Sequence, residues 1–97
     1  MKIQYTESAK GLYRDAVAYT FDRNPYAARA FVVNVEKMED RLCDFPLSGS
    51  QIPEFLNSVY KQCFVKPYRF FYRVDDRAEY IIITAVYHDK QIPSKPE

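Results

Sequence analysis

The stretch PYRFFYRVDD, residues 67–76, places two arginines in a run that otherwise consists mainly of aromatic residues. Successive side chains of a β-strand point to opposite faces of the sheet. The two sets are Tyr68, Phe70, Tyr72 and Val74 on one face, and Arg69, Phe71, Arg73 and Asp75 on the other. The first set is apolar and predicts a face packed against helices. The second predicts a half-open face on which guanidinium groups are either solvated or functional.

Two further apolar runs flank this strand. The segment SVYKQCFVK (58–66) precedes it, and EYIIITAVY (79–87) follows the turn DDRA. A turn centred on residues 76–77 would place Tyr72 opposite Ile81. The arginines would then share a face with Tyr80, Ile82, Thr84, Val86 and His88. We therefore expect Arg69, Arg73 and His88 on one face, with Lys61 as a third cation if the register directs it there.

The N-terminal half reads as a short strand, KIQYT, followed by two helices. Ser8 or Thr6 caps the first helix, which ends near residues 24–25. The second, NPYAARAFVVNVEKMEDRL (24–42), has Asn24 as a cap and Pro25 at its first position. Its apolar stripe consists of Ala27, Phe31, Val35, Met38 and Leu42. Residues 43–57, CDFPLSGSQIPEFLN, predict a long irregular loop.

The element order is therefore β-α-α-β-β-β, which predicts an α+β domain. We expect an antiparallel meander sheet covered on one face by a helical hairpin. Residues 1–97 are expected to form a single domain, with residues 88–97 as a flexible tail.

Composition excludes several classes of function. The formal net charge is +1, so bulk attraction to nucleic acid or to a membrane is not implied. One histidine and two separated cysteines do not make a zinc set, and no cofactor is indicated. The two thiols are expected to be reduced, and no signal or membrane-spanning segment is visible, which predicts a cytoplasmic protein.

Several motifs resemble the RelE/ParE toxin superfamily of bacterial toxin–antitoxin modules. These are NPYAARAF, the loop FPLSGSQIPEF, and VKPYRFFYRVDDRAEYIIITAVYHDKQIP with its terminal H..Q.P pattern. The resemblance covers the chain from the first strand to about Pro93. It implies a growth-inhibiting toxin of the stress-response or plasmid-stabilisation type, neutralised by a cognate antitoxin. It also implies one of two activities, because fold alone does not fix function.

One implied activity is that of a metal-independent, ribosome-dependent mRNA endoribonuclease, as in RelE-like and YoeB-like members. By resemblance, Arg69 would stabilise the phosphate charge, Glu54 would act as the base, and Tyr87 and His88 would supply an acid, a base or a stacking contact. The Glu54-to-Arg69 interval is shorter here than in those nucleases. The low net charge also departs from that of RNA-cutting members.

The other implied activity is ParE-like inhibition of DNA gyrase by protein binding, which the C-terminal half resembles slightly more. Arg69, Arg73 and Lys61 would then contact a partner or order the sheet. A chain that has lost toxicity and only binds antitoxin is a third alternative. The antitoxin is expected on the exposed side of the helical hairpin and on the arginine face.

Overall fold

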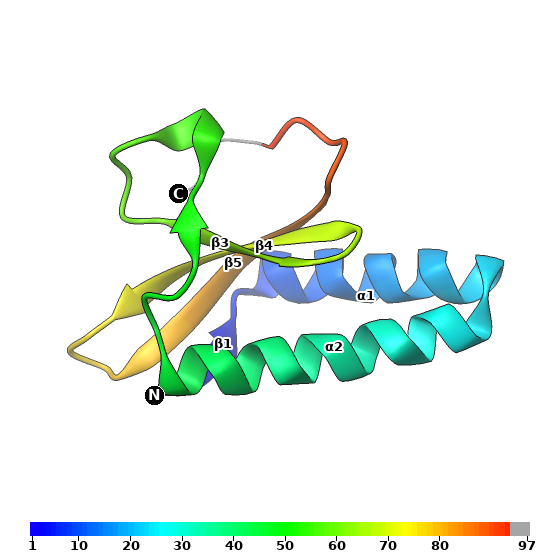
Figure 1. Cartoon of the computed structure of the whole chain (residues 1–97), viewed down its shortest axis with the longest axis horizontal. Helices are drawn as coiled ribbons and strands as arrows, with labels where there is room; N and C mark the ends of the chain where they lie inside the picture. The colour runs from blue at the N-terminus through cyan, green and yellow to red at the C-terminus, as the bar shows by residue number, and fades with distance from the viewer. Residues whose placement is uncertain (94–97) are drawn as a thin grey trace.

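Two long helices and a five-stranded sheet make up residues 1–93, the residues that this computed structural model describes (Figure 1). The elements are β1 (Lys2–Tyr5), α1 (Glu7–Arg23), α2 (Pro25–Asp44), β2 (Ser50–Gln51), the 3-10 helix η1 (Pro53–Phe55), β3 (Lys61–Val65), β4 (Tyr68–Asp75) and β5 (Tyr80–His88). The predicted α+β class and the order of the long elements are confirmed. The predicted loop 43–57 also contains β2 and η1, which the sequence pattern did not reveal.

The turn of the helical hairpin consists of a single residue, Asn24, which caps both helices. At its other end, α1 is capped by Thr6, which accepts a hydrogen bond from the backbone N–H of Ala9. The backbone N–H of Asn24 closes the end of α1, and its side chain accepts from Tyr26 and Ala27 at the start of α2. Because Asn24 is extended and serves both helices, the chain reverses with no further linker residue.

The sheet is mixed rather than wholly antiparallel. Its strand order is β1-β5-β4-β3-β2. The meander β3-β4-β5 is antiparallel, as expected. β1, however, lies parallel to β5, with Ile3 opposite Ile81. The crossover from β1 to β5 includes both helices, which is the kind of connection that parallel pairing requires.

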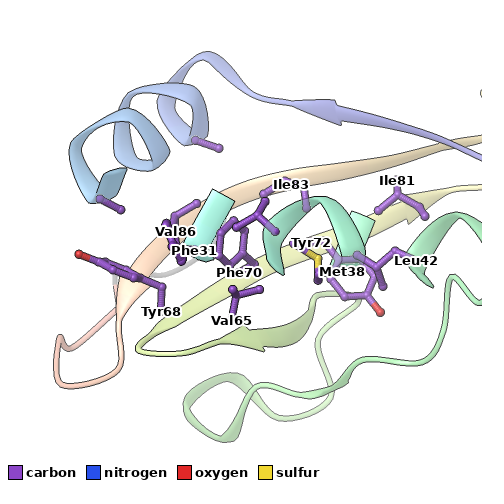
Figure 2. Packing of buried hydrophobic residues seen from close by; sticks show 13 residues of the cluster. Phe31, Met38, Leu42, Val65, Tyr68, Phe70, Tyr72, Ile81, Ile83 and Val86 are labelled. Atoms are coloured by element: carbon purple, nitrogen blue, oxygen red, sulfur yellow. The ribbon is translucent and has the colours of Figure 1, made fainter. Parts of the chain in front are cut away.

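The main core lies between the helices and the sheet. Phe31, Met38 and Leu42 of α2 pack on Phe70 and Tyr72 of β4, and further residues of α1, β3 and β5 complete the cluster in Figure 2. Phe70, Tyr72, Ile81 and Ile83 are fully buried. Burial of each such side chain stabilises the fold by about 1.5–3 kcal/mol. The prediction that Tyr68, Phe70, Tyr72 and Val74 face the helices is therefore confirmed.

Part of the predicted C-terminal tail lies within the described residues. His88 is the last residue of β5, and the backbone N–H of Asp89 donates to the carbonyl of Pro67. Pro93 is buried. The remainder of the predicted tail, residues 94–97, lies outside the described residues.

Neither helix of the described chain has the length and apolar character needed to cross a membrane.

Candidate functional site

Arg69 lies at the centre of a polar cluster on the sheet face away from the helices. Its guanidinium makes a bidentate ion pair with Glu54, at 2.9 Å from Nη1 to Oε2 and 2.7 Å from Nη2 to Oε1. Nε and Nη2 also donate to Oε1 of Gln62 at 3.0 and 2.8 Å. A guanidinium has five N–H groups, so these four hydrogen bonds leave one without a partner in the cluster.

Burial makes this cluster asymmetric. The Arg69 side chain is 6% exposed, whereas that of Glu54 is 41% exposed. The guanidinium also lies 5.0 Å from the centroid of the Phe71 ring. The hydrogen bonds from Arg69 lower the pKa of Glu54, and the hydrogen bonds to Glu54 raise the pKa of Arg69. Both groups are therefore held in their charged forms.

The segment between α2 and β3 folds back over this face and covers it. Figure 1 shows η1 on the side of the sheet opposite α1 and α2. Ile52, which precedes η1, is fully buried against Phe71 and Ala85. We expected a half-open face here, and this expectation is wrong at Arg69, because the loop forms a second, small core over the middle of the sheet.

The hydroxyl of the buried Tyr72 holds the start of that segment against the sheet through two hydrogen bonds. Tyr72 Oη donates to the carbonyl of Pro46 at 2.8 Å and accepts from the backbone N–H of Gly49 at 2.9 Å. A Cβ on Gly49 would lie 2.5 Å from Tyr72 Oη and 2.8 Å from the carbonyl oxygen of Gln62. Only glycine fits this close approach. The segment between α2 and β3 is therefore held on the sheet at two points: Gly49 donates to Tyr72, and Glu54 pairs with Arg69.

A register shift in the β4-β5 hairpin separates His88 from Arg69. Tyr72 lies opposite Ile83, but Phe71 lies opposite Ala85, which leaves Thr84 as an extra residue in β5. Such a bulge reverses which face the following residues occupy. The prediction that His88 shares a face with the arginines is therefore wrong.

His88 instead lies on the helix side of the sheet, opposite Tyr68. The two rings pack edge to face, with centroids 5.4 Å apart. His88 Nδ1 accepts a hydrogen bond from the backbone N–H of Lys90 at 3.1 Å, which closes the turn after β5. With Asp15 and Tyr19 of α1, His88 lines a hollow of about 440 Å³.

The other predicted residues divide between the two faces. Tyr87 lies opposite Arg69 and packs edge to face on Phe71 at 5.4 Å, so it belongs to the Arg69 side. Arg73 lies on that side as well, opposite Ile82. Lys61 lies opposite Tyr72, on the helix side, so it does not join Arg69. The structure thus brings together Glu54, Arg69 and Tyr87 and leaves His88 and Lys61 apart.

Gln62 is a member of this cluster that no sequence pattern indicated; it is 5% exposed and lies opposite Phe71. Alternation along KQCFV places it on the Arg69 face once the register is known. Within residues 1–93, no group of three His, Cys, Asp or Glu side chains is placed to hold a metal ion. Cys43 and Cys63 are both free thiols.

An apolar groove of about 970 Å³ runs along the other side of the molecule, between β1 and the two helices. Its apolar lining includes Ile3, Tyr13, Val17, Phe21 and Val32. Phe21 is 56% exposed, so this groove is an apolar surface of the helical hairpin that solvent reaches.

The sequence matches the family model described as the ParE toxin of the type II toxin–antitoxin system parDE, over residues 3–93. The chain belongs to the ParE toxin family. Most of the described sequence is covered by this match, including both helices and the strands that carry Arg69 and His88. No curated protein matches the sequence.

Three solved structures contain a chain with a similar fold. The chain is similar to one in the RelBE2 toxin–antitoxin complex from Mycobacterium tuberculosis, with a TM-score of 0.62 and 19% identity over 90% of this chain and 95% of that one. It is similar to a chain of the chromosomal ParDE system from P. aeruginosa, with a TM-score of 0.67 and 17% identity over 91% and 95%. It also resembles a YoeB/ParE toxin from Agrobacterium tumefaciens, with a TM-score of 0.60 and 20% identity over 91% and 98%. These likenesses show the fold alone.

Proposed function

We propose that this ParE-family toxin inhibits DNA gyrase by binding it in the cytoplasm, and that a cognate antitoxin neutralises it. The observation that supports the proposal is that Arg69 is buried and that most of its N–H groups are hydrogen-bonded within the protein. A catalytic arginine must offer its N–H groups to a phosphate, but four of the five are used within the protein and the side chain is 6% exposed.

The same cluster argues against general-base chemistry at Glu54. Both of its carboxylate oxygens accept hydrogen bonds from Arg69, which lowers its pKa. A lowered pKa makes a carboxylate a weaker base. His88, the residue expected to complete the nuclease set, lies across the sheet. In this proposal, the ion pair therefore holds the loop on the sheet, and the protein acts through its surface.

Antitoxin binding is supported by the exposed apolar groove of the helical hairpin. Its lining also contains two cations, Lys10 and Arg14, and one acid, Asp22. Lys10 is paired with Glu7, so Arg14 is the cation of this lining that makes no ion pair within the described residues. An amphipathic antitoxin helix with acidic residues at its edge would cover this surface.

The alternative function is a ribosome-dependent endoribonuclease of the RelE/YoeB type. One observation favours it: Glu54, Arg69 and Tyr87 do gather on one face, as that activity requires. On this alternative, the segment with η1 would have to move away before RNA could reach Arg69.

Two assays on the purified protein separate the functions. We expect increasing amounts of the protein to block supercoiling of relaxed plasmid by gyrase, and mRNA in a reconstituted translation reaction to remain intact. Codon-spaced mRNA cuts without an effect on gyrase would refute the proposal. No effect in either assay would indicate a chain that has lost toxicity.

A further inference from the structure

A second groove lies between the C-terminal half of α2 and the outer edge of the sheet. Its volume is about 630 Å³. Residues of α2 form one wall, and residues of β3 and of the segment around β2 form the other. It shares no lining residue with the apolar groove of the helical hairpin, so the two surfaces are separate.

The charged residues that line this groove are all cations, namely Lys37, Arg41 and Lys66. Each is exposed, and none takes part in an ion pair within residues 1–93. Two acids of the same helix, Asp40 and Asp44, lie outside the lining. The whole chain has a net charge of only +1, so the groove is a local concentration of positive charge that favours an anionic ligand.

The charge of Arg41 acts across the groove. Burial raises the pKa of the Cys63 thiol, and the positive charge of Arg41 opposes this rise. Such an effect requires the two groups to lie close together. Because Cys63 belongs to β3 and Arg41 to α2, the guanidinium is placed near the opposite wall. Lys37 precedes Arg41 by four residues and therefore lies beside it on the same face of α2.

The uncharged polar groups of the lining fit a nucleic-acid backbone. Asn34, Ser48 and Ser50 are exposed there and add an amide and two hydroxyls to the three cations. Phosphate and sugar contacts in protein–DNA complexes come from Arg and Lys together with Ser, Thr, Asn and Gln. A protein ligand also brings N–H donors, but the lining has no carboxylate to accept them. The sugar–phosphate backbone of DNA presents acceptors only.

We propose that this groove binds the sugar–phosphate backbone of one strand of duplex DNA, with Lys37, Arg41 and Lys66 on its phosphates. The inference rests on the proposed function, because gyrase acts on duplex DNA and a toxin bound to gyrase would meet that DNA. Three phosphate contacts bind free DNA weakly. DNA already held by gyrase is present at a high effective concentration, so the same contacts would strengthen inhibition.

The experiment measures binding of the full chain to a short labelled duplex of random sequence by fluorescence anisotropy, between about 50 and 200 mM salt. For three phosphate contacts, the slope of the logarithm of the binding constant against that of the salt concentration should be about −2.7. The variant Lys37→Gln, Arg41→Gln, Lys66→Gln should lose most of this slope and need roughly tenfold more protein to inhibit gyrase supercoiling. Asp40→Asn combined with Asp44→Asn should instead tighten DNA binding, because it removes negative charge beside the groove.

The matched control neutralises three exposed cations outside this groove, Arg29→Gln, Arg77→Gln and Lys90→Gln, with the same change in net charge. It should keep a slope near that of the wild type. Equal loss of slope in both triple variants, or tighter binding of single-stranded polyuridine RNA than of the duplex, would overturn the inference.

A groove variant that binds the duplex like the wild type but no longer binds the antitoxin encoded beside its gene would also overturn the inference, because the groove would then be a protein-binding site. A wild-type protein that inhibits gyrase without binding the duplex at low salt would refute the inference and leave the proposed function standing. If the wild type binds the duplex through the three cations but does not inhibit gyrase, the proposed function fails and the DNA-binding groove stands.

Discussion

Removing the Arg69 side chain is expected to destabilise the fold more than removing the carboxylate that pairs with it. Arg69→Ala leaves Oε1 of the buried Gln62 without its two donors, at a cost of about 1–3 kcal/mol. It also removes the guanidinium that lies 5.0 Å from the centroid of the Phe71 ring. We expect a loss of about 3 kcal/mol in the free energy of unfolding, near the upper end of that range.

Glu54→Ala leaves the guanidinium bound to Gln62 and open to water on the Glu54 side. Breaking a fully buried ion pair costs about 3–5 kcal/mol. The Glu54 side chain is 41% exposed, and solvent screening weakens its ion pair. We therefore expect Glu54→Ala to lower the free energy of unfolding by only about 1–2 kcal/mol. In the Arg69→Ala background, Glu54→Ala should cost almost nothing further, because its partner is already absent.

Urea unfolding followed by circular dichroism measures all four forms of this double-mutant cycle. Arg73→Ala is the matched control, since Arg73 lies on the same face and makes no side-chain hydrogen bond within the described residues. We expect it to cost less than about 0.5 kcal/mol. If Arg69→Ala is as stable as the control, or if the two single losses simply add, the cluster does not hold the loop and the reasoning is wrong.

Three further predictions concern the loop, its ion pair and the helical hairpin. Gly49→Ala should cost about 1–3 kcal/mol in thermal unfolding, because the new Cβ would overlap Tyr72 Oη; an unchanged melting temperature would contradict this. The pKa of Glu54 is lowered from 4.5, so the advantage of the wild type over Glu54→Gln should be present above pH 4.5 and disappear as the pH falls through the lowered pKa. An advantage that persists in strong acid would exclude the ion pair as its source. Asn24→Ala should cost about 1 kcal/mol in urea unfolding, since two N–H groups at the start of α2 lose their acceptor, and a smaller loss than Asn24→Gly would argue against the cap.

The helices and the meander could be predicted because their patterns are strongly periodic. The apolar stripe of α2 predicted Ala27, Phe31, Val35, Met38 and Leu42 in the core, and the last four are buried. Ala27 is exposed, and the neighbouring Ala28 is buried instead, so the prediction was wrong at the first turn. Alternation along β4 likewise separated Phe70 from Arg69 correctly. The sequence also identified Glu54 and Arg69 as members of one candidate site, through a resemblance rather than through spacing.

The bulge at Thr84 could not be predicted from the pattern. The run YIIITAVYH is apolar at most positions on both faces, so no polar residue marks which side chains point inward. The extra residue therefore places His88 on the helix side, and the alternation of apolar and polar residues in β5 does not reveal this change.

The burial of Arg69 also depends on contacts distant in sequence. Glu54 and Arg69 are separated by a loop, a strand and a turn, and Ile52 is buried only because the chain returns over Phe71. The sequence IPEF gives one indication that Glu54 has a partner on the sheet, because this single acid lies between apolar residues. The parallel pairing of β1 with β5 likewise follows from the position of the helices and not from any local signal.

The most direct test of the account compares gyrase supercoiling in the presence of the wild-type protein and of Glu54→Gln. The amide keeps an acceptor for Arg69 but removes the only base that the nuclease alternative assigns to this loop. We predict that both proteins inhibit supercoiling at the same concentration, with mRNA intact in a parallel translation reaction. Growth arrest that depends on Glu54 and is accompanied by codon-spaced mRNA cuts, with gyrase unaffected, would contradict it.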